Sequence, residues 1–281
     1  MNQEKISPIA IIGGGEMGTA IMAGWIGAQT GPAAHLTAKD FIVANPGQER
    51  RDYLTEEFGV TCVPDAREIA DAKLVVLAVK PQIMAGVLDT IADRPPYSGK
   101  DSGPLFISVA AGLSTASLEK HLPQGARLVR VMPNMPLKVG AGAAGVAKGS
   151  AATDADFDLV CNLFDSLGYA CKVEEDAIDI VCGLSGSGPA YVAAMVDALA
   201  KAAKDQGLDE NLAENLALQT VYGTAEYMRQ TGISARDTCD SICTPGGTTA
   251  AAMDAMRARD FDGVFAAGVN AAVRRSKELG A

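Results

Sequence analysis

The sequence predicts an α/β protein: a doubly wound, mostly parallel sheet followed by a second domain built only of helices. Two observations lead to this fold class. Through roughly the first 170 residues, short continuous apolar runs alternate with helical patterns, whereas from about residue 176 only helical patterns remain. Uninterrupted apolar strands between helices are typical of a parallel sheet that is covered on both faces.

The sheet-forming part, residues 1–175, repeats a strand and a helix along the chain. Its strands are expected at 8–12, 40–44, 74–79, 105–110 and 127–132, and its helices at 17–28, 48–58, 82–92 and 114–121. Two weaker apolar stretches between residues 140 and 172 flank a helical pattern at 153–167. We expect them to extend the same sheet.

The remaining part, residues 176–281, is predicted to be a helical domain. Its helices are expected at 176–182, 189–205, 210–230, 234–242, 246–257 and 260–279. In the helix at 189–205 a stripe of apolar residues runs along one side and small residues cover much of the rest; the stripe is formed by Val192, Met195, Val196, Leu199 and Ala203. A helix that is apolar around most of its circumference packs on more than one side. Either a dimer interface or an intramolecular core satisfies this pattern.

Four glycines crowd into six positions directly after the first predicted strand, and Gly13, Gly15 and Gly18 form the spacing G-x-G-x-x-G. The first glycine permits a tight turn, the second lets a diphosphate approach the backbone, and the third lets the helix pack closely. A tight turn without a ligand is the simpler alternative. The surrounding strand and helix favour a Rossmann-type dinucleotide-binding domain.

The end of the second strand bears on the choice of cofactor. No acidic residue stands after Ala44 to accept hydrogen bonds from the ribose of NADH, and Arg50 and Arg51 follow shortly. Arginines at this point favour the 2′-phosphate of NADPH, with NADH as the other possible cofactor. Paired arginines are just as typical of a solvated helix face. Lys80 ends the central strand, before Pro81, and is expected at the ligand-binding edge of the sheet or, alternatively, on the surface.

Two further glycine-rich turns open helices in the second half, LSGSGPAY at 184–191 and CTPGGTT at 243–249. Proline and hydroxyl residues suit a helix start, so simple capping accounts for one such turn. In PGGTT the two glycines also expose the helix entrance, which could bind a carboxylate through its N–H groups.

Composition excludes several classes of function. The formal net charge is −10 without a basic block, so nucleic acid and anionic membranes are not expected partners. Neither a signal peptide nor a membrane-spanning segment is expected, which indicates a soluble cytoplasmic protein. The six cysteines and two histidines form no pattern typical of a metal site, although Cys239 and Cys243 stand one helical turn apart.

Together, IGGGEMG, LAVKP, VRVMPNMP, GLSGSGPAY, ALQTVYGTA and above all TPGGTT resemble the pyrroline-5-carboxylate reductase family, collinearly from about residue 8 to 279. The resemblance implies reduction of a cyclic imine to L-proline with NAD(P)H, by a homodimer or a ring of dimers. It also implies a set of cofactor residues: Ile12, Gly13, Gly14, Gly15, Glu16, Met17, Asn45, Asp65, Ala78, Val79, Lys80, Pro81, Ala110 and Ala111. The implied substrate residues are Glu175, Ser241, Gly246, Gly247, Thr248 and Thr249, with Thr249 and Lys80 in catalytic roles and no metal.

The chain departs from the family pattern at Met135 and Thr244, where threonine and serine are usual, and at Asp65, where asparagine is usual. Residues 231–239 also lack the proline and leucine that usually precede PGG. A carboxylate at Asp65 would repel the phosphates of NADPH. Two other functions stay open from the residues alone. A 3-hydroxyacid dehydrogenase would need Lys201 or Lys204 as its acid or base, and a dinucleotide sensor would need no PGGTT turn.

Overall fold

The computed structural model of the chain describes residues 6–98 and 103–280. Its contacts divide it into two compact units. The sheet unit contains the residues up to Ser187 together with those from Ala271 onward, and the helical unit is Gly188–Asn270.

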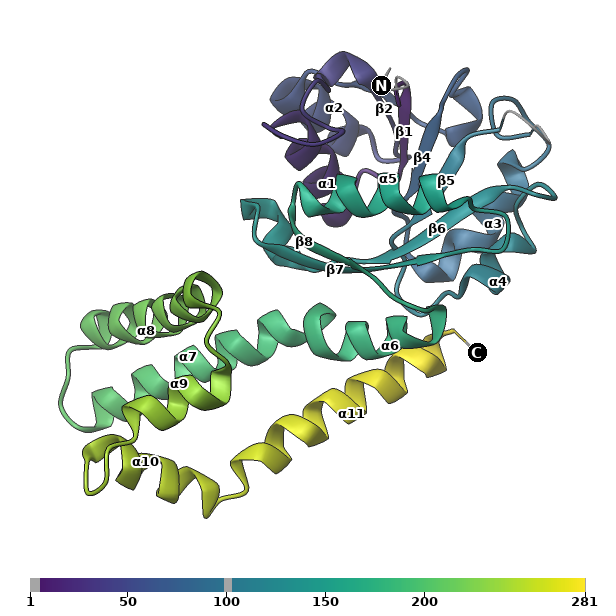
Figure 1. The fold of residues 1–281 in the computed structure, drawn as a ribbon. Coiled ribbons are helices and arrows are strands. Elements are labelled where there is room, and N and C mark those ends of the chain that lie inside the picture. The colour runs from purple at the N-terminus through teal and green to yellow at the C-terminus, as the bar shows by residue number, and fades with distance from the viewer. Residues whose placement is uncertain (1–5, 99–102, 281) are drawn as a thin grey trace. The chain divides into compact units, whose positions relative to one another are not determined.

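Among the described residues, eight strands form one sheet in the order β3-β2-β1-β4-β5-β6-β7-β8 (Figure 1). The strands are β1 (Ile9–Ile12), β2 (Phe41–Ala44), β3 (Thr61–Val63), β4 (Leu74–Leu77), β5 (Leu105–Ser108), β6 (Arg127–Met132), β7 (Gly142–Lys148) and β8 (Gly168–Lys172). The first six are parallel, β7 is antiparallel to β6, and β8 is parallel to β7. The predicted fold class, including the two strands added after residue 140, is confirmed.

One strand was absent from the sequence prediction. β3 has only three residues, and it pairs with β2 at the edge of the sheet. Thr61 is exposed and Cys62 and Val63 are half-buried. An edge strand is buried on neither face completely, so it lacks the continuous apolar run that identified the central strands.

The two faces of the sheet are covered by different helices. Alternate residues of β1 point to opposite faces, with Ile9 and Ile11 in one core cluster and Ala10 and Ile12 in the other. The first cluster is covered by α1 (Glu16–Ile26), α2 (Gln48–Phe58) and α5 (Asp154–Asp165). The second is covered by α3 (Pro81–Ile91) and α4 (Thr115–Glu119). Short 3-10 turns occupy η1 (Ala38–Asp40), η2 (Ala66–Glu68), η3 (Met135–Val139) and η4 (Glu175–Ala177).

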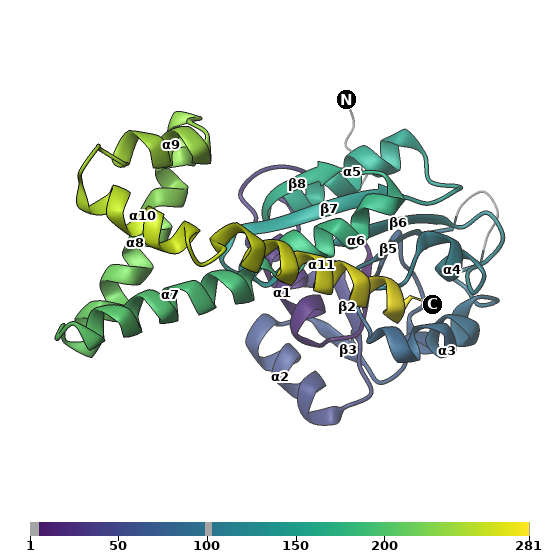
Figure 2. The same cartoon turned by 90° about the horizontal axis from the view of Figure 1, so that it is seen from below.

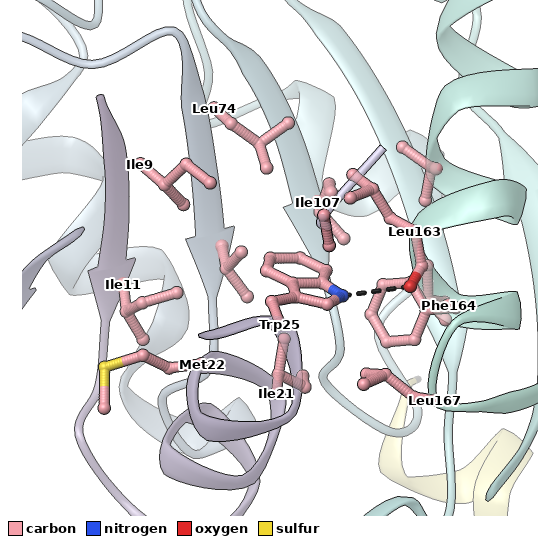
Figure 3. Packing of buried hydrophobic residues seen from close by; sticks show 14 of the residues in the cluster. Ile9, Ile11, Ile21, Met22, Trp25, Leu74, Ile107, Leu163, Phe164 and Leu167 are labelled. Carbon is pink, nitrogen blue, oxygen red and sulfur yellow. Dashed lines mark hydrogen bonds between the residues drawn. The ribbon is translucent and has the colours of Figure 1, made fainter. Parts of the chain in front are cut away.

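Trp25, the only tryptophan of the chain, joins α1 to α5 in the first core (Figure 3). Its indole Nε1 donates a hydrogen bond to the carbonyl of Leu163 at 3.0 Å. Its ring meets Phe164 edge to face, with the ring centroids 5.6 Å apart. The hydrogen bond satisfies the one polar group that a fully buried indole carries.

The division by contacts differs from the predicted boundary between residues 175 and 176. The segment after η4, with α6 (Ile178–Val181) and the π-helical turn η5 (Cys182–Gly186), packs on the sheet because Ile178 is fully buried. The end of α11 (Phe261–Leu279) also belongs to the sheet unit, where it runs beside α6 (Figure 2). There the Ser276 hydroxyl donates to the Asp179 carboxylate at 2.6 Å.

The helical unit contains α7 (Gly188–Asp205), α8 (Glu210–Thr231), α9 (Ala235–Ile242), α10 (Thr248–Arg257) and the first half of α11. Its own core is small and consists of alanines where α7 meets α8, namely Ala200, Ala213 and Ala217. Many large apolar side chains of this unit are exposed instead, among them Leu199, Leu212, Leu216, Tyr222, Val264 and Phe265. The unit alone therefore leaves much of its apolar surface without a covering.

One helical stretch among the described residues, Glu175–Asp205, is long and apolar enough to cross a membrane by length and composition alone. Its most apolar 18-residue window has a mean hydropathy of 1.2, and 11% of that window is buried. An apolar helix that packs against another subunit has the same composition, so this property by itself identifies no membrane span.

Candidate active site

The glycine-rich loop connects β1 to α1 in a conformation that requires glycine. Gly13 has φ +108°, and a Cβ atom there would lie 2.7 Å from the backbone of Ala78 in the neighbouring strand connection. A Cβ on Gly18 would overlap the carbonyl oxygen of Gly13. Around Gly15, by contrast, a Cβ would meet nothing within 4 Å. Two of the glycines therefore serve close packing, and the middle one leaves open space for a ligand.

A cavity of about 790 Å³ opens beside this loop, at the carboxyl ends of β1, β2, β3 and β4. Its lining consists of Ile12, Gly13, Gly15, Ala44, Asn45, Pro46, Pro64, Asp65, Ala66, Ala78, Val79, Lys80, Gln82, Ile83, Gly86, Val87 and Thr90. Open parallel sheets bind ligands at this edge, and its volume suits a ligand of several hundred cubic ångströms.

The cavity brings together eight of the predicted cofactor residues: Ile12, Gly13, Gly15, Asn45, Asp65, Ala78, Val79 and Lys80. The six others do not line it. Gly14 and Met17 pack inward, and Glu16 forms an ion pair with Lys138 on η3. Pro81 is the first residue of α3, Ala110 is buried in the second core cluster, and Ala111 follows it.

The side chain of Lys80 is exposed at the start of α3, as expected for a group that meets a ligand at this edge. One face of α3 adds further lining residues that the sequence analysis missed: Gln82, Ile83, Gly86, Val87 and Thr90. Their spacing of one, three and four positions is the helical signal that could have identified them.

Arg50 and Arg51 both donate hydrogen bonds to backbone carbonyls instead of lining the cavity. The Arg51 guanidinium donates to the carbonyls of Asn45 at 2.8 Å and Pro46 at 2.7 Å. The Arg50 guanidinium donates to the Gly14 carbonyl at 2.6 Å and to the Thr19 hydroxyl at 2.8 Å. Arg51 thus supports the connection after β2, and Arg50 supports the glycine loop.

Asp65 carries its own counter-ion. Its carboxylate is 2.5 Å from the Arg67 guanidinium and also accepts a hydrogen bond from the Arg67 N–H at 2.8 Å. These bonds hold the pKa of Asp65 below its usual value. The carboxylate at this wall of the cavity is therefore paired with a cation, which reduces the repulsion of a phosphate that its sequence position suggested.

Tyr97 supports the same wall from the core. Its hydroxyl donates to the carbonyl of Ala66 at 2.8 Å, and burial raises the pKa of the phenol. Neither Arg67 nor Tyr97 was singled out from the sequence, because only the folded chain brings Tyr97 to η2.

These features fit a dinucleotide. Gly15 is the N-cap residue of α1 and provides no side-chain cap, so the first N–H groups of the helix and the open space at Gly15 are available for a diphosphate. A side chain at Gly15 would fill that space.

Glu175 lies in the sheet unit, in a network with a buried arginine. Its carboxylate accepts hydrogen bonds from the Arg130 guanidinium at 2.7 Å and from the Thr115 N–H at 3.0 Å. The Arg130 side chain is 4% exposed. A buried cation needs such a partner, so Glu175 has a structural task in addition to the substrate role predicted for it.

The PGGTT turn lies in the helical unit together with the other predicted substrate residues. Gly246 has φ +71°, and Gly247, the N-cap residue of α10, provides no side-chain cap. The N–H groups of the first turn of α10, which contains Thr248 and Thr249, are thus not used by a cap. Ser241, near the end of the preceding helix α9, donates its hydroxyl proton to the carbonyl of Thr238 at 2.7 Å.

Other groups considered from the sequence have simpler surroundings. Lys201 pairs with Asp197 and Lys204 with Glu210, all four on the surface. The Sγ atoms of Cys239 and Cys243 are 4.0 Å apart. Within residues 6–98 and 103–280, no cluster of three or more His, Cys, Asp or Glu side chains could hold a metal ion.

The fold and this cavity define a dinucleotide-dependent oxidoreductase with an NADP-binding domain, and comparison with known proteins agrees. Residues 8–112 match a family model described as NADP oxidoreductase, coenzyme F420-dependent. Residues 175–279 match one described as pyrroline-5-carboxylate reductase dimerisation.

Full-length relatives identify the family. The chain is 38% identical over 97% of its length to a pyrroline-5-carboxylate reductase of Synechocystis, covering 98% of that protein, and 36% identical over 96% to one of Glycine max, covering 95%. The solved reductase of Coxiella burnetii matches with a TM-score of 0.88 and 34% identity, covering 98% of this chain and 99% of that one. The chain belongs to the pyrroline-5-carboxylate reductase family.

A second solved relative bears on the cofactor. The pyrroline carboxylate reductase of Plasmodium falciparum, whose structure has NADP bound, matches with a TM-score of 0.85 and 28% identity over 99% of both chains. That structure shows NADP bound in a protein of the same fold.

Proposed function

We propose that this protein reduces 1-pyrroline-5-carboxylate to L-proline, the last step of proline biosynthesis, with NADPH as the preferred reductant. The proposal is carried by the cavity beside an uncapped glycine loop, in a chain similar over 97% of its length to a reductase of this name. The reaction adds a hydride to the imine carbon and a proton to the imine nitrogen.

The cofactor, when bound, supplies the hydride, and the chain supplies position and charge. The open Gly15 and the first turn of α1 hold the diphosphate, and Asn45 and Asp65 line the adenosine side. Lys80, exposed at the mouth of the same cavity, contacts the ribose or a phosphate. NADH remains the second cofactor to test, because the guanidinium groups of Arg50 and Arg51 both bind backbone carbonyls.

The substrate carboxylate is assigned to the N–H groups of Gly246, Gly247 and Thr248, at the uncapped start of α10. Thr249 directs its hydroxyl to the imine nitrogen. Ser241, on the preceding helix α9, belongs to the same proposed set. A protonated imine is already electrophilic, so orientation by a hydroxyl satisfies the chemistry without a histidine.

We also propose that the working form is a homodimer or a ring of dimers located in the cytoplasm. The apolar side chains that the helical unit leaves exposed support subunit packing, as does the match of residues 175–279 to a dimerisation domain. The same packing accounts for the apolar stretch Glu175–Asp205 without a membrane.

The test is the loss of absorbance at 340 nm when the purified protein is mixed with 1-pyrroline-5-carboxylate and NADPH or NADH, with L-proline quantified as the product. Formation of proline, faster with NADPH, is the expected result. Tight binding of NADPH without turnover of any cyclic imine would instead support the dinucleotide sensor. Oxidation of a 3-hydroxyacid would support the dehydrogenase.

A further inference from the structure

We propose that Arg50 is a positioning residue for the cofactor diphosphate, which acts by holding the Gly14 carbonyl from behind the glycine loop. The inference deepens the proposed function, because it takes a dinucleotide as the ligand. It differs from the sequence hypothesis, in which Arg50 binds the 2′-phosphate of NADPH.

The contacts of Arg50 all lead to the loop or restrain its own side chain. Its Nε donates to the Gly14 carbonyl at 2.6 Å, and an Nη donates to the Thr19 hydroxyl at 2.8 Å. The Thr19 hydroxyl in turn donates to the same carbonyl at 3.2 Å. The guanidinium also stacks over the ring of Tyr53, 4.9 Å from its centroid. Two donors on α1 and α2 thus converge on one carbonyl oxygen.

The hydrogen bonds to the Gly14 carbonyl determine the direction of the Gly15 N–H. The Gly14–Gly15 peptide is planar and trans, so its C=O and N–H face opposite sides. Because the carbonyl is held toward Arg50, the N–H of Gly15 faces away from Arg50. Gly15 lines the large cavity, whereas Arg50 and Thr19 line a smaller cavity of about 320 Å³ behind the loop. Arg50 therefore presents the Gly15 N–H to the side where a diphosphate binds.

The positive charge of Arg50 also affects the donor strength of the Gly15 N–H. A hydrogen bond from a cation to the carbonyl polarises the peptide and makes its N–H a stronger donor to an anion. The chain as a whole carries a net charge of −10, which opposes an anionic cofactor, so a half-buried cation beside the loop has a local effect that the total charge hides.

The other charged groups nearby are already paired with each other. Glu16 and Lys138, which also line the small cavity, form an ion pair, and this bond together with the charge of Arg50 lowers the pKa of Glu16. Glu16 accordingly stays ionised and partnered at neutral pH, and Arg50 keeps its bonds to the loop.

The experiment is a titration of the full-length protein with NADPH, NADH and ADP. ADP contains the diphosphate but lacks both the 2′-phosphate and the nicotinamide. The variants are Arg50→Met, Arg50→Lys and Thr19→Val, with Lys39→Met as the matched control. Lys39 is an exposed cation of the same unit, outside both cavities, and its replacement causes the same change of charge.

For Arg50→Met we expect binding about tenfold weaker for all three ligands alike, since loss of one charge-assisted hydrogen bond is of this order. At saturating NADPH, kcat stays within about twofold of the wild type, so the change appears in KM for the cofactor. Arg50→Lys recovers part of the affinity through one donor, and Thr19→Val loses about threefold. Lys39→Met changes none of them.

A loss confined to NADPH, with NADH and ADP unchanged, would overturn the proposal in favour of contact with the 2′-phosphate. Unchanged affinity for all three ligands would overturn it as well. Should Arg50→Met fold poorly, as seen from its thermal unfolding, Thr19→Val and Arg50→Lys carry the test. A wild-type protein that binds NADPH but reduces no cyclic imine would contradict the proposed substrate and leave these titrations decisive.

Discussion

At the scale of single residues, the glycine loop shows two different reasons for glycine: close packing of the backbone and open space for a ligand. Gly13 is required by the fold, because its φ of +108° and the nearby backbone of Ala78 leave no room for a side chain. Gly15 is not required by the fold, because the space around it is open. A glycine without a packing reason, at the start of an uncapped helix, indicates a ligand.

This difference is testable with the same substitution at both positions. Gly15→Val is expected to fold normally and to abolish NADPH binding, because the side chain fills the space that we propose for the diphosphate. Gly13→Val is expected to reduce the melting temperature strongly or to prevent folding. Thermal unfolding and NADPH titration of both variants distinguish these results. Normal NADPH binding by Gly15→Val would refute the assignment of the loop.

A second substitution addresses the imine nitrogen. Thr249→Ala is expected to lower kcat by about 10²-fold while leaving the NADPH affinity nearly unchanged, because the role that we propose for the hydroxyl involves the substrate alone. Thr224→Ala, which removes an exposed hydroxyl bonded within α8, is the matched control. If Thr249→Ala turned over at the wild-type rate, the role given to Thr249 would be wrong.

At the scale of elements, the two ends of α1 have different roles. Its first turn offers N–H groups beside the cavity, and its last turn contains Trp25, which fixes the helix to α5. The anchoring matters for the site because movement of α1 would also move the glycine loop.

Trp25→Phe is expected to lower the free energy of unfolding by about 1–2 kcal/mol, since it removes a buried hydrogen bond and leaves part of the indole volume empty. Urea denaturation followed by circular dichroism measures this, because the variant has no tryptophan fluorescence. Tyr169→Phe, at a side chain that is 65% exposed, serves as the control and should change stability little. An equal stability of wild type and Trp25→Phe would contradict the anchoring role.

At the scale of the whole molecule, the two units differ in how they bury apolar surface. The sheet unit encloses two large core clusters, while the helical unit has three buried alanines and many exposed large apolar residues. Within the helical unit, Tyr191, Met195, Met256, Val264 and Phe265 help to line an apolar cavity of about 540 Å³. Contiguous apolar surface of this kind marks an interaction site.

Phe265→Asp is therefore expected to convert the dimer largely to monomer, because a carboxylate cannot be desolvated without a partner in an apolar interface. Light scattering after size-exclusion chromatography measures the mass of the particle. Ala34→Asp adds the same charge on an exposed loop of the sheet unit and should leave the mass unchanged. A Phe265→Asp protein that remains dimeric at micromolar concentration would exclude this surface from the interface.

Much of the fold followed from the sequence, because its central strands and helices carry local patterns. The strand at 127–132 and the helix at 48–58 were predicted with the bounds that the structure has. β3 was missing from the prediction because an edge strand of three residues has no continuous apolar run. The predicted boundary after residue 175 differs from the division by contacts, because that division depends on long-range contacts. These are the packing of Ile178 on the sheet and the contacts of the end of α11 within the sheet unit.

For the candidate site, the sequence alone determined the class of cofactor and the family, because the glycine spacing and the PGGTT turn act through backbone geometry that neighbouring residues set. Only the tertiary structure decided what the side chains do. It turned Arg50 toward the Gly14 carbonyl and brought Tyr97 to the carbonyl of Ala66. The physical reason is that a flexible charged side chain takes the partner nearest in space, and that partner depends on how distant segments of the chain pack together.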